Sequence, residues 1–119
     1  MSDPVTEAMQ DALAGEHAAV YAYGVVGGRL DYGTKYQKLA TRHFDDHRAR
    51  RDALIAFLRR AGATPVGAEP TYQLPTGIGS EKDAQRVAQR VEDRCSVLYA
   101  GVVATASGEP RTFAVTALG

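Results

Sequence analysis

The chain has 119 residues, of which 45% are hydrophobic and 24% charged, and its 14 acidic and 14 basic residues cancel. A chain of this length forms one domain with a single core, and this composition argues against a disordered or membrane-spanning protein. The zero net charge argues against nucleic-acid binding. Cys95 is the single cysteine, which excludes an intramolecular disulfide. The N-terminus has neither the basic nor the apolar region of a secretory signal, so the sequence predicts a cytoplasmic protein.

The first predicted helix covers residues 4–28. Asp3 is a favourable N-cap, and Pro4 suits the first helical position, where its missing N–H is not needed. Within this helix, mostly apolar residues recur at alternating spacings of four and three, which is the pattern of the buried stripe of a bundle helix. The stripe consists of Met9, Leu13, Glu16, Val20, Tyr23, Gly27 and Leu30.

A charged residue, Glu16, interrupts this stripe at the start of the segment EHAAVYAYG. A carboxylate inside a bundle is costly unless it is paired, hydrogen-bonded or bound to a metal ion. Two interpretations follow: Glu16 is a ligand of a metal centre, or it pairs with an arginine such as Arg50 or Arg51. His17 lies beside the stripe, and we expect it to help fill the contact between this helix and a neighbour.

A second helix is predicted over residues 35–61, with Thr34 as N-cap in the capping-box pattern TKYQ and Gly62 as the C′ residue. His43 and His47 lie four residues apart on one face, a spacing at which two histidines can bind one zinc or iron ion. The alternative is a partly solvated flank within HFDDHRARRD. Because arginines and aspartates alternate there, we expect a salt-bridged, solvated face and no nucleic-acid site.

The segment over residues 62–80 contains three prolines and several glycines and cannot be helical. About eighteen extended residues reach up to ~60 Å, enough to run the length of a bundle and to start the third helix parallel to the second. Val66, Tyr72, Leu74 and Ile78 would hold this crossover on the surface. One long crossover at this point predicts a ferritin-like four-helix bundle.

The third predicted helix covers residues 81–105, with Ser80 as N-cap, and the fourth covers residues 110–119. The stripe of the third helix is Ala84, Ala88, Val91, Cys95, Leu98 and Val102. The fourth helix is too short to cover the groove left by three long helices. We therefore expect an exposed apolar groove and a homodimer formed through it.

Glu92 borders the stripe of the third helix, in line with Cys95. It can face the interior and form a two-carboxylate site with Glu16; a surface ion pair with Arg90 or Arg94 is the alternative. Cys95 itself is interpreted as a small buried hydrophobic residue. Core aromatics whose hydroxyls would satisfy buried carboxylates or histidines are expected at Tyr21, Tyr23 and Tyr99.

Four blocks of the sequence, LAGEHAAVYAYGVVGGRL, RHFDDHRARRDAL, GATPV…YQLP and VEDRCSVLYAGVVA, occur in an order and spacing that resemble an actinobacterial ferritin-like family of unassigned function. The resemblance covers nearly the whole chain and implies a ferritin-like four-helix bundle. Members of that family have a longer fourth helix, so by this resemblance the chain is expected to be short at its C-terminus.

Ferritin-like di-iron proteins place Glu on the first helix, Glu-x-x-His on the second, Glu on the third and Glu-x-x-His on the fourth. Glu16 matches the first position and Glu92 the third. The second fails because Phe44 stands three residues before His47, and RTFAVTALG offers no ligand for the fourth. The sequence thus favours a non-catalytic binding or assembly scaffold with a degenerate metal site and no cofactor.

Two sets of site residues follow from these interpretations. The polar core cluster of the favoured scaffold is predicted as Glu16, His17, Tyr23 and Tyr99. The alternative is a metalloprotein that binds iron, manganese or zinc through Glu16, His43, His47 and Glu92.

Overall fold

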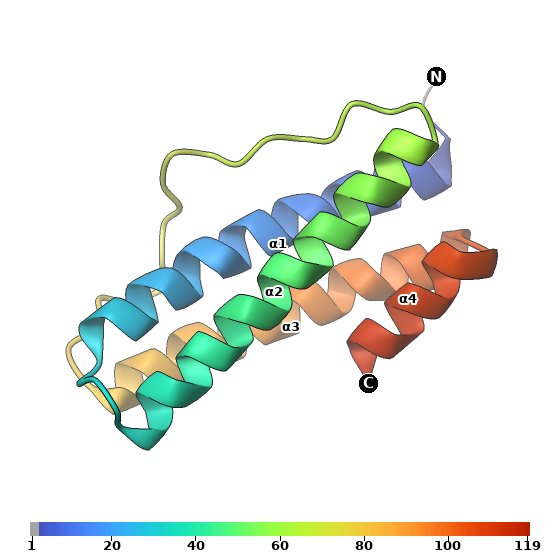
Figure 1. Ribbon diagram of the computed structural model, residues 1–119. Coiled ribbons are helices and arrows are strands. Elements are labelled where there is room, and N and C mark those ends of the chain that lie inside the picture. Colours follow the sequence, from blue (N-terminus) through green and yellow to red (C-terminus); the bar gives the residue numbers. More distant parts are fainter. Residues whose placement is uncertain (1–2) are drawn as a thin grey trace.

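The computed structural model describes residues 3–119, and over this range the chain is all-helical, with four helices and no strand (Figure 1). The first helix, α1, spans Pro4–Arg29, α2 spans Lys35–Arg60, α3 spans Glu81–Thr105 and α4 spans Gly108–Leu118. These bounds lie within two residues of those expected from the sequence, and the predicted all-helical class is confirmed.

Local sequence explains where the helices begin and end. The side chains of Asp3, Thr34 and Ser80 each accept a backbone N–H in the first turn of α1, α2 and α3. The end of α2 carries the two backbone hydrogen bonds of a Schellman motif, and Gly62 has a φ of +80° there. A residue with a side chain would be strained in this conformation, so glycine sets the end of α2.

The central element of the fold is α1, which packs against both α2 and α3, while α4 packs against α3. Figure 1 shows α1 antiparallel to α2, and α3 parallel to α2, as the crossover argument predicts. At Gly15, α1 approaches α3 so closely that an added Cβ would collide with the side chain of Leu98.

The connection between α2 and α3 runs along the outer side of α1 (Figure 1). The amide of Gln10 holds it from both sides, because Nε2 donates to the Thr64 carbonyl at 2.8 Å and Oε1 accepts from the Val66 N–H at 2.8 Å. Two helical turns further along α1, His17 Nε2 lies 2.9 Å from the Val66 carbonyl oxygen. Hydrogen bonds from α1 therefore fix this part of the crossover.

Hydrophobic contacts complete the attachment of the crossover. Tyr72 packs against Tyr21 of α1 at 5.6 Å between ring centroids, and Leu74 and Ile78 pack against the core. The predicted anchor Val66 is different, since its side chain is exposed. Its backbone, not its side chain, is what α1 binds.

The buried face of α1 departs from the predicted stripe in the second half of the helix. Val20 and Gly27 are only half-buried, and Ala19 and Val26 are buried instead. A strict alternation of four and three has a period of 3.5, whereas a straight helix has 3.6 residues per turn, so the stripe drifts around the helix. Glu16 lies before this drift becomes large, and its predicted burial is confirmed by an exposed fraction of 0%.

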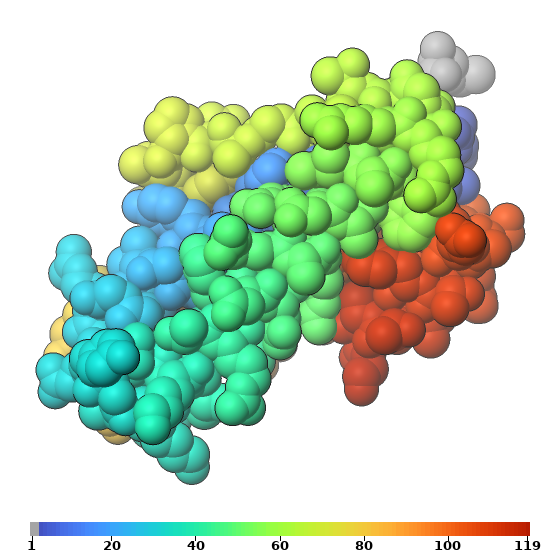
Figure 2. Space-filling view, viewed as in Figure 1, coloured from blue at the N-terminus to red at the C-terminus, as the bar shows by residue number. Residues whose placement is uncertain are grey.

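Two apolar clusters divide the core along the length of the molecule. The first, which we call the closed end, lies under α4 and includes Met9, Leu13, Leu54, Leu58, Tyr99, Val102 and Ala114. The second, the open end, lies beyond α4 and consists of Ala22, Tyr23, Val26, Ala40, Ala84 and Val87. Figure 2 shows α4, in red, confined to one end of the molecule beside the later part of α2.

Phe113 holds α4 at the closed end. Its ring centroid lies 5.6 Å from that of Phe57 on α2 and 5.8 Å from that of Tyr99 on α3. Exposed ion pairs lie on the outer side of α2, at Arg48 with Asp45 and at Arg51 with Asp52. This solvated face agrees with the salt-bridged surface predicted from the sequence. No helix in residues 3–119 is long and apolar enough to cross a membrane.

Candidate functional site

A buried carboxylate on the central helix lies between the closed and open ends. Glu16 projects from α1 towards both α2 and α3 and is fully buried. Its Oε1 is hydrogen-bonded to His47 Nδ1, and its Oε2 accepts a hydrogen bond from the Tyr99 hydroxyl. Of the two arginines considered as partners of Glu16, Arg51 pairs with Asp52 instead, and within residues 3–119 Glu16 forms its ion pair with His47 and not with Arg50.

His47 connects this carboxylate to a second one. The ring is fully buried on α2, and Nε2 lies 2.8 Å from Glu92 Oε2 on α3. The Tyr23 hydroxyl donates to the same Glu92 oxygen at 2.6 Å. Glu16, His47, Glu92, Tyr23 and Tyr99 thus form one continuous network, which we call the polar core, with members from three helices.

Both ring nitrogens of His47 face side-chain carboxyl groups, which favours the doubly protonated imidazolium. A neutral imidazole has one N–H and one lone pair, and the lone pair cannot hydrogen-bond to a carboxylate oxygen. An imidazolium donates from both nitrogens. Burial alone would lower the pKa of His47, but the hydrogen bonds and charges of Glu16 and Glu92 outweigh it and raise the pKa to about 9.

The other members of the polar core respond to the same charges. Burial would raise the pKa of Glu92, but hydrogen bonds from His47 and Tyr23 outweigh it and lower the pKa to about 2. Burial, followed by the neighbouring carboxylates, raises the pKa of Tyr23 and of Tyr99 well above the ordinary value. At neutral pH the network therefore contains a cationic imidazolium, an ionised Glu92 and two protonated phenols.

Cys95 lies beside the polar core and was not among the site residues predicted from the sequence. One donor atom each from Glu16, His47 and Cys95 lies within 4.8 Å of the others, a spacing at which three groups can hold a metal ion. The sequence contained the signal, because Cys95 follows Glu92 by three residues and precedes Tyr99 by four. Burial raises the pKa of the Cys95 thiol to about 12, so the group is a neutral thiol.

Two predicted site residues lie outside the polar core. His17 points away from it and contacts the crossover, which is the neighbouring segment that its position beside the stripe suggested. His43 is half-buried, and its ring stacks on Tyr23 at 5.2 Å between centroids and an interplanar angle of 22°. Tyr21, predicted as a core aromatic, is only half-buried and packs against Tyr72.

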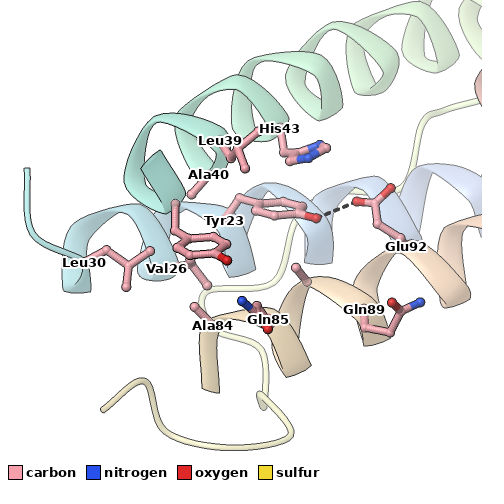
Figure 3. Close-up of a pocket in the computed structure, with 12 residues that line it drawn as sticks. Tyr23, Val26, Leu30, Leu39, Ala40, His43, Ala84, Gln85, Gln89 and Glu92 are labelled. Carbon is pink, nitrogen blue, oxygen red and sulfur yellow. Dashed lines mark hydrogen bonds between the residues drawn. The ribbon is translucent and has the colours of Figure 1, made fainter. Parts of the chain in front are cut away.

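A pocket of about 360 Å³ opens at the open end, between α1, α2 and α3 (Figure 3). Its walls are mainly apolar, and Glu92, His43, two glutamines and two tyrosines contribute polar groups. Figure 3 shows the Tyr23 hydroxyl directed at Glu92 beside this space. The remaining lining residues are Val26, Leu30, Tyr36, Leu39, Ala40, Ala84, Gln85, Ala88 and Gln89. The pocket therefore ends at one carboxylate of the polar core.

Comparison with known proteins identifies relatives of the chain but no activity. A search of curated proteins found no match. Among solved structures, the chain is similar to the crystal structure of a conserved hypothetical protein from Mycobacterium tuberculosis, with 38% sequence identity and a TM-score of 0.88. The similarity covers 97% of this chain and 80% of that one. Residues 8–119 match a family described as a domain of unknown function, DUF4439, and the chain therefore belongs to that family.

Proposed function

We propose that this protein is a non-catalytic helical binding module whose buried charges are held together by protons and not by a metal ion. The observation that carries the proposal is the position of His47, with Nδ1 on Glu16 and Nε2 on Glu92. An imidazolium has no lone pair to offer a metal, so each His47–carboxylate contact takes the place of a metal–ligand bond.

The scaffold that supports this proposal is ferritin-like in its connections. An antiparallel pair, α1 and α2, a long crossover and a third helix parallel to the second are the arrangement of ferritin-like bundles. In such bundles, core carboxylates and histidines from facing helices hold a di-iron centre. The position of the polar core between α1, α2 and α3 corresponds to that location.

The donor set does not fit a di-iron centre. Phe44 occupies the position three residues before His47, where the second helix would carry a glutamate. The acidic residue of α4, Glu109, is exposed and pairs with Arg60 at 3.3 Å. Within residues 3–119, no buried side-chain nitrogen or oxygen atom lacks a hydrogen-bond partner. A site built for an absent metal would leave such atoms unpaired, so we derive no reaction through iron.

The proposed binding surface is the groove at the open end, where α4 does not cover α1, α2 and α3. Its pocket lies in the volume range of small-molecule sites, which is about 300–1,000 Å³. The homodimer predicted from the sequence would use the same groove. Its test is gel filtration, in which a mass of two chains supports the dimer and a mass of one chain contradicts it.

Elemental analysis with metal added back tests the proton-held core. We expect purified protein to contain far less than one equivalent of iron, manganese or zinc per chain. The metal content should remain this low after incubation with each metal followed by desalting. Stoichiometric metal that is lost in Glu16→Gln would contradict the proposal. Asp46→Asn is the matched control, because Asp46 is an exposed carboxylate one residue before His47.

A second candidate function is binding of a single metal ion. The observation that favours it is the approach of Glu16, His47 and Cys95 donor atoms to within 4.8 Å of one another. Imidazole, thiolate and carboxylate together suit zinc. Zinc binding would require loss of protons from His47 and Cys95, and therefore release of protons that a pH-stat or a weakly buffered titration detects. Cys95→Ser would weaken such a site and leave the proton-held network intact.

A further inference from the structure

We propose that the pocket at the open end binds a small organic cation, namely a monoalkyl ammonium whose charged end meets Glu92 and whose hydrocarbon chain lies against the apolar walls. The inference rests on the proposed function as a binding module and names the class of ligand. Three features of the pocket support it: the charge of Glu92, the aromatic ring that orients this carboxylate, and the apolar walls.

The charge of the pocket selects a cation. Glu92 is the one acidic residue that lines it, and neither lysine nor arginine is part of the lining. Both hydrogen bonds received by this carboxylate, from His47 and from Tyr23, end on Oε2. Within residues 3–119, Oε1 has no hydrogen-bond partner, and the Glu92 side chain is 40% exposed. An ammonium group bound at Oε1 would therefore leave both hydrogen bonds of Glu92 to the polar core in place.

Aromatic rings orient Glu92 and form part of the pocket wall. The Tyr23 ring stacks on the imidazoles of His43 and His47, at 5.2 and 5.3 Å between centroids. Its hydroxyl is directed at Glu92 (Figure 3). Tyr36 contributes another ring to the pocket, and the Lys35 ammonium lies 5.9 Å from the centroid of that ring. Arg50, on α2, partly offsets the field of the carboxylates, but it does not line the pocket.

The walls of the pocket away from Glu92 favour a ligand with a hydrocarbon chain. The apolar part of the lining consists of Val26 of α1, Leu30 at the C-cap of α1, Leu39 and Ala40 of α2, and Ala84 of α3. These side chains carry no charge, and burying a hydrocarbon chain against them is favourable. The combination of one carboxylate and apolar walls fits a ligand that is cationic at one end and apolar along its length.

Isothermal titration calorimetry with three six-carbon probes tests the assignment. We expect n-hexylammonium to bind with one site per chain, and 1-hexanol and hexanoate to bind at least about tenfold more weakly, because a charge-assisted hydrogen bond is lost or replaced by repulsion. Equal affinity for the three probes, or no binding of n-hexylammonium, would overturn the proposal. Nα-acetyl-lysine amide carries the same ammonium group on an amino-acid side chain. If this probe binds more tightly than n-hexylammonium, the proposal of a free amine ligand is overturned in favour of a lysine side chain of a partner protein.

Two variants and a matched control locate the site. Glu92→Gln keeps the shape of the side chain and removes its charge, and we expect about a tenfold loss of n-hexylammonium affinity. Ala88→Phe fills the pocket and replaces no member of the polar core, and we expect binding to be lost while the circular dichroism spectrum is kept. Asp46→Asn removes an exposed carboxylate outside the pocket and should change affinity less than about twofold. Unchanged affinity in Ala88→Phe would overturn the proposal even if Glu92→Gln fails to fold.

Failure of this inference is distinguishable from failure of the proposed function. If the protein is free of metal and does not bind n-hexylammonium, the proposed ligand class is contradicted, and the proposal of a proton-held core is unaffected. A two-chain mass in gel filtration, combined with no binding of the probe, would assign the groove to a second copy and overturn the proposal. Protein that carries stoichiometric metal and still binds n-hexylammonium at Glu92 would contradict the metal-free core and support the pocket.

Discussion

The two ends of the molecule are built from different residues, although the same three long helices form both. At the closed end, Leu13, Leu54 and Leu58 are fully buried beneath α4. At the open end, half of the buried residues are alanines, namely Ala22, Ala40 and Ala84. Leucines are fully buried only in the cluster that the fourth helix covers, and those packed against the open-end cluster are partly buried. Where cover is missing, small residues leave the pocket that ends at Glu92.

The polar core lies at the boundary between these two ends. Tyr99, whose hydroxyl donates to Glu16, belongs to the closed-end cluster, and Tyr23, whose hydroxyl donates to Glu92, belongs to the open-end cluster. His47 joins the two carboxylates. The boundary therefore contains the groups whose burial costs most if a partner is removed.

Removal of His47 should have the largest effect on stability. His47→Ala leaves Glu16 buried without its cationic partner, so we expect the free energy of unfolding to fall by roughly 3–5 kcal/mol. Urea denaturation followed by circular dichroism measures the loss. His43→Ala is the matched control on the same face of α2, because His43 is half-buried and stacks on Tyr23. Equal losses in the two variants would contradict the central role of His47.

A leucine pair sharpens the contrast between the ends. Leu54 is fully buried at the closed end, so Leu54→Ala should cost about 2–5 kcal/mol through lost burial and a residual cavity. Leu39 lines the pocket and is only half-buried, so Leu39→Ala should cost less than about half of that. Chemical denaturation of both variants under one set of conditions gives the comparison. A larger loss for Leu39→Ala would mean that another molecule covers the open end.

The dependence of stability on pH follows from the polar core. The pKa of His47 is raised from 6.5 to about 9, so its contribution is complete below about pH 6.5 and is lost as pH rises through about 9. The pKa of Glu92 is lowered from 4.5 to about 2, so its contribution is complete above about pH 4.5 and is lost as pH falls through about 2. These two groups predict a maximum between about pH 4.5 and 6.5.

Urea denaturation across this range of pH checks the profile, and His47→Gln serves as the comparison. The variant should lack the alkaline decline, because glutamine does not titrate. A decline between about pH 6.5 and 9 that is the same in the variant would assign it to groups outside the polar core.

The smallest effect is expected at the surface of the closed end. Arg60 and Glu109 join α2 to α4 at 3.3 Å, and both side chains are exposed. Exposed ion pairs contribute about 0–1 kcal/mol, so Glu109→Gln should change stability by less than about 1 kcal/mol. A thermal melt at low and high salt measures it. A loss above this range would show that the ion pair, and not Phe113, holds α4 in place.

The sequence predicts the helices well because their ends depend on local signals. Asp3, Thr34 and Ser80 are N-caps that act within one turn, and Gly62 ends α2 through its own backbone conformation. The path of the crossover follows from its proline content and length. Residues that pack by side-chain shape were harder to place, as the exposed side chain of Val66 shows.

The polar core could be predicted only in part, because spacing identifies a face of a helix but not the partner across the interface. The 4-3 pattern placed Glu16 inside, and the line of Glu92 with Cys95 placed the second carboxylate at the border. Which histidine joins them depends on the relative rotation of α1, α2 and α3. His43 and His47 lie one turn apart on α2, and the sequence of α2 alone does not tell which of them faces the two carboxylates. The pocket depends on the same rotation and on the reach of α4.

The protonation state of His47 tests the account most directly. Nitrogen-15 NMR of histidine-labelled protein, followed from pH 6 to pH 10, reports each ring nitrogen separately. The account predicts that Nδ1 and Nε2 of His47 are both protonated at pH 7.5, that they titrate together near pH 9, and that equimolar Zn²⁺ leaves both signals unchanged. A His47 that has one unprotonated nitrogen at pH 7.5, or whose signals move on addition of Zn²⁺, would contradict it.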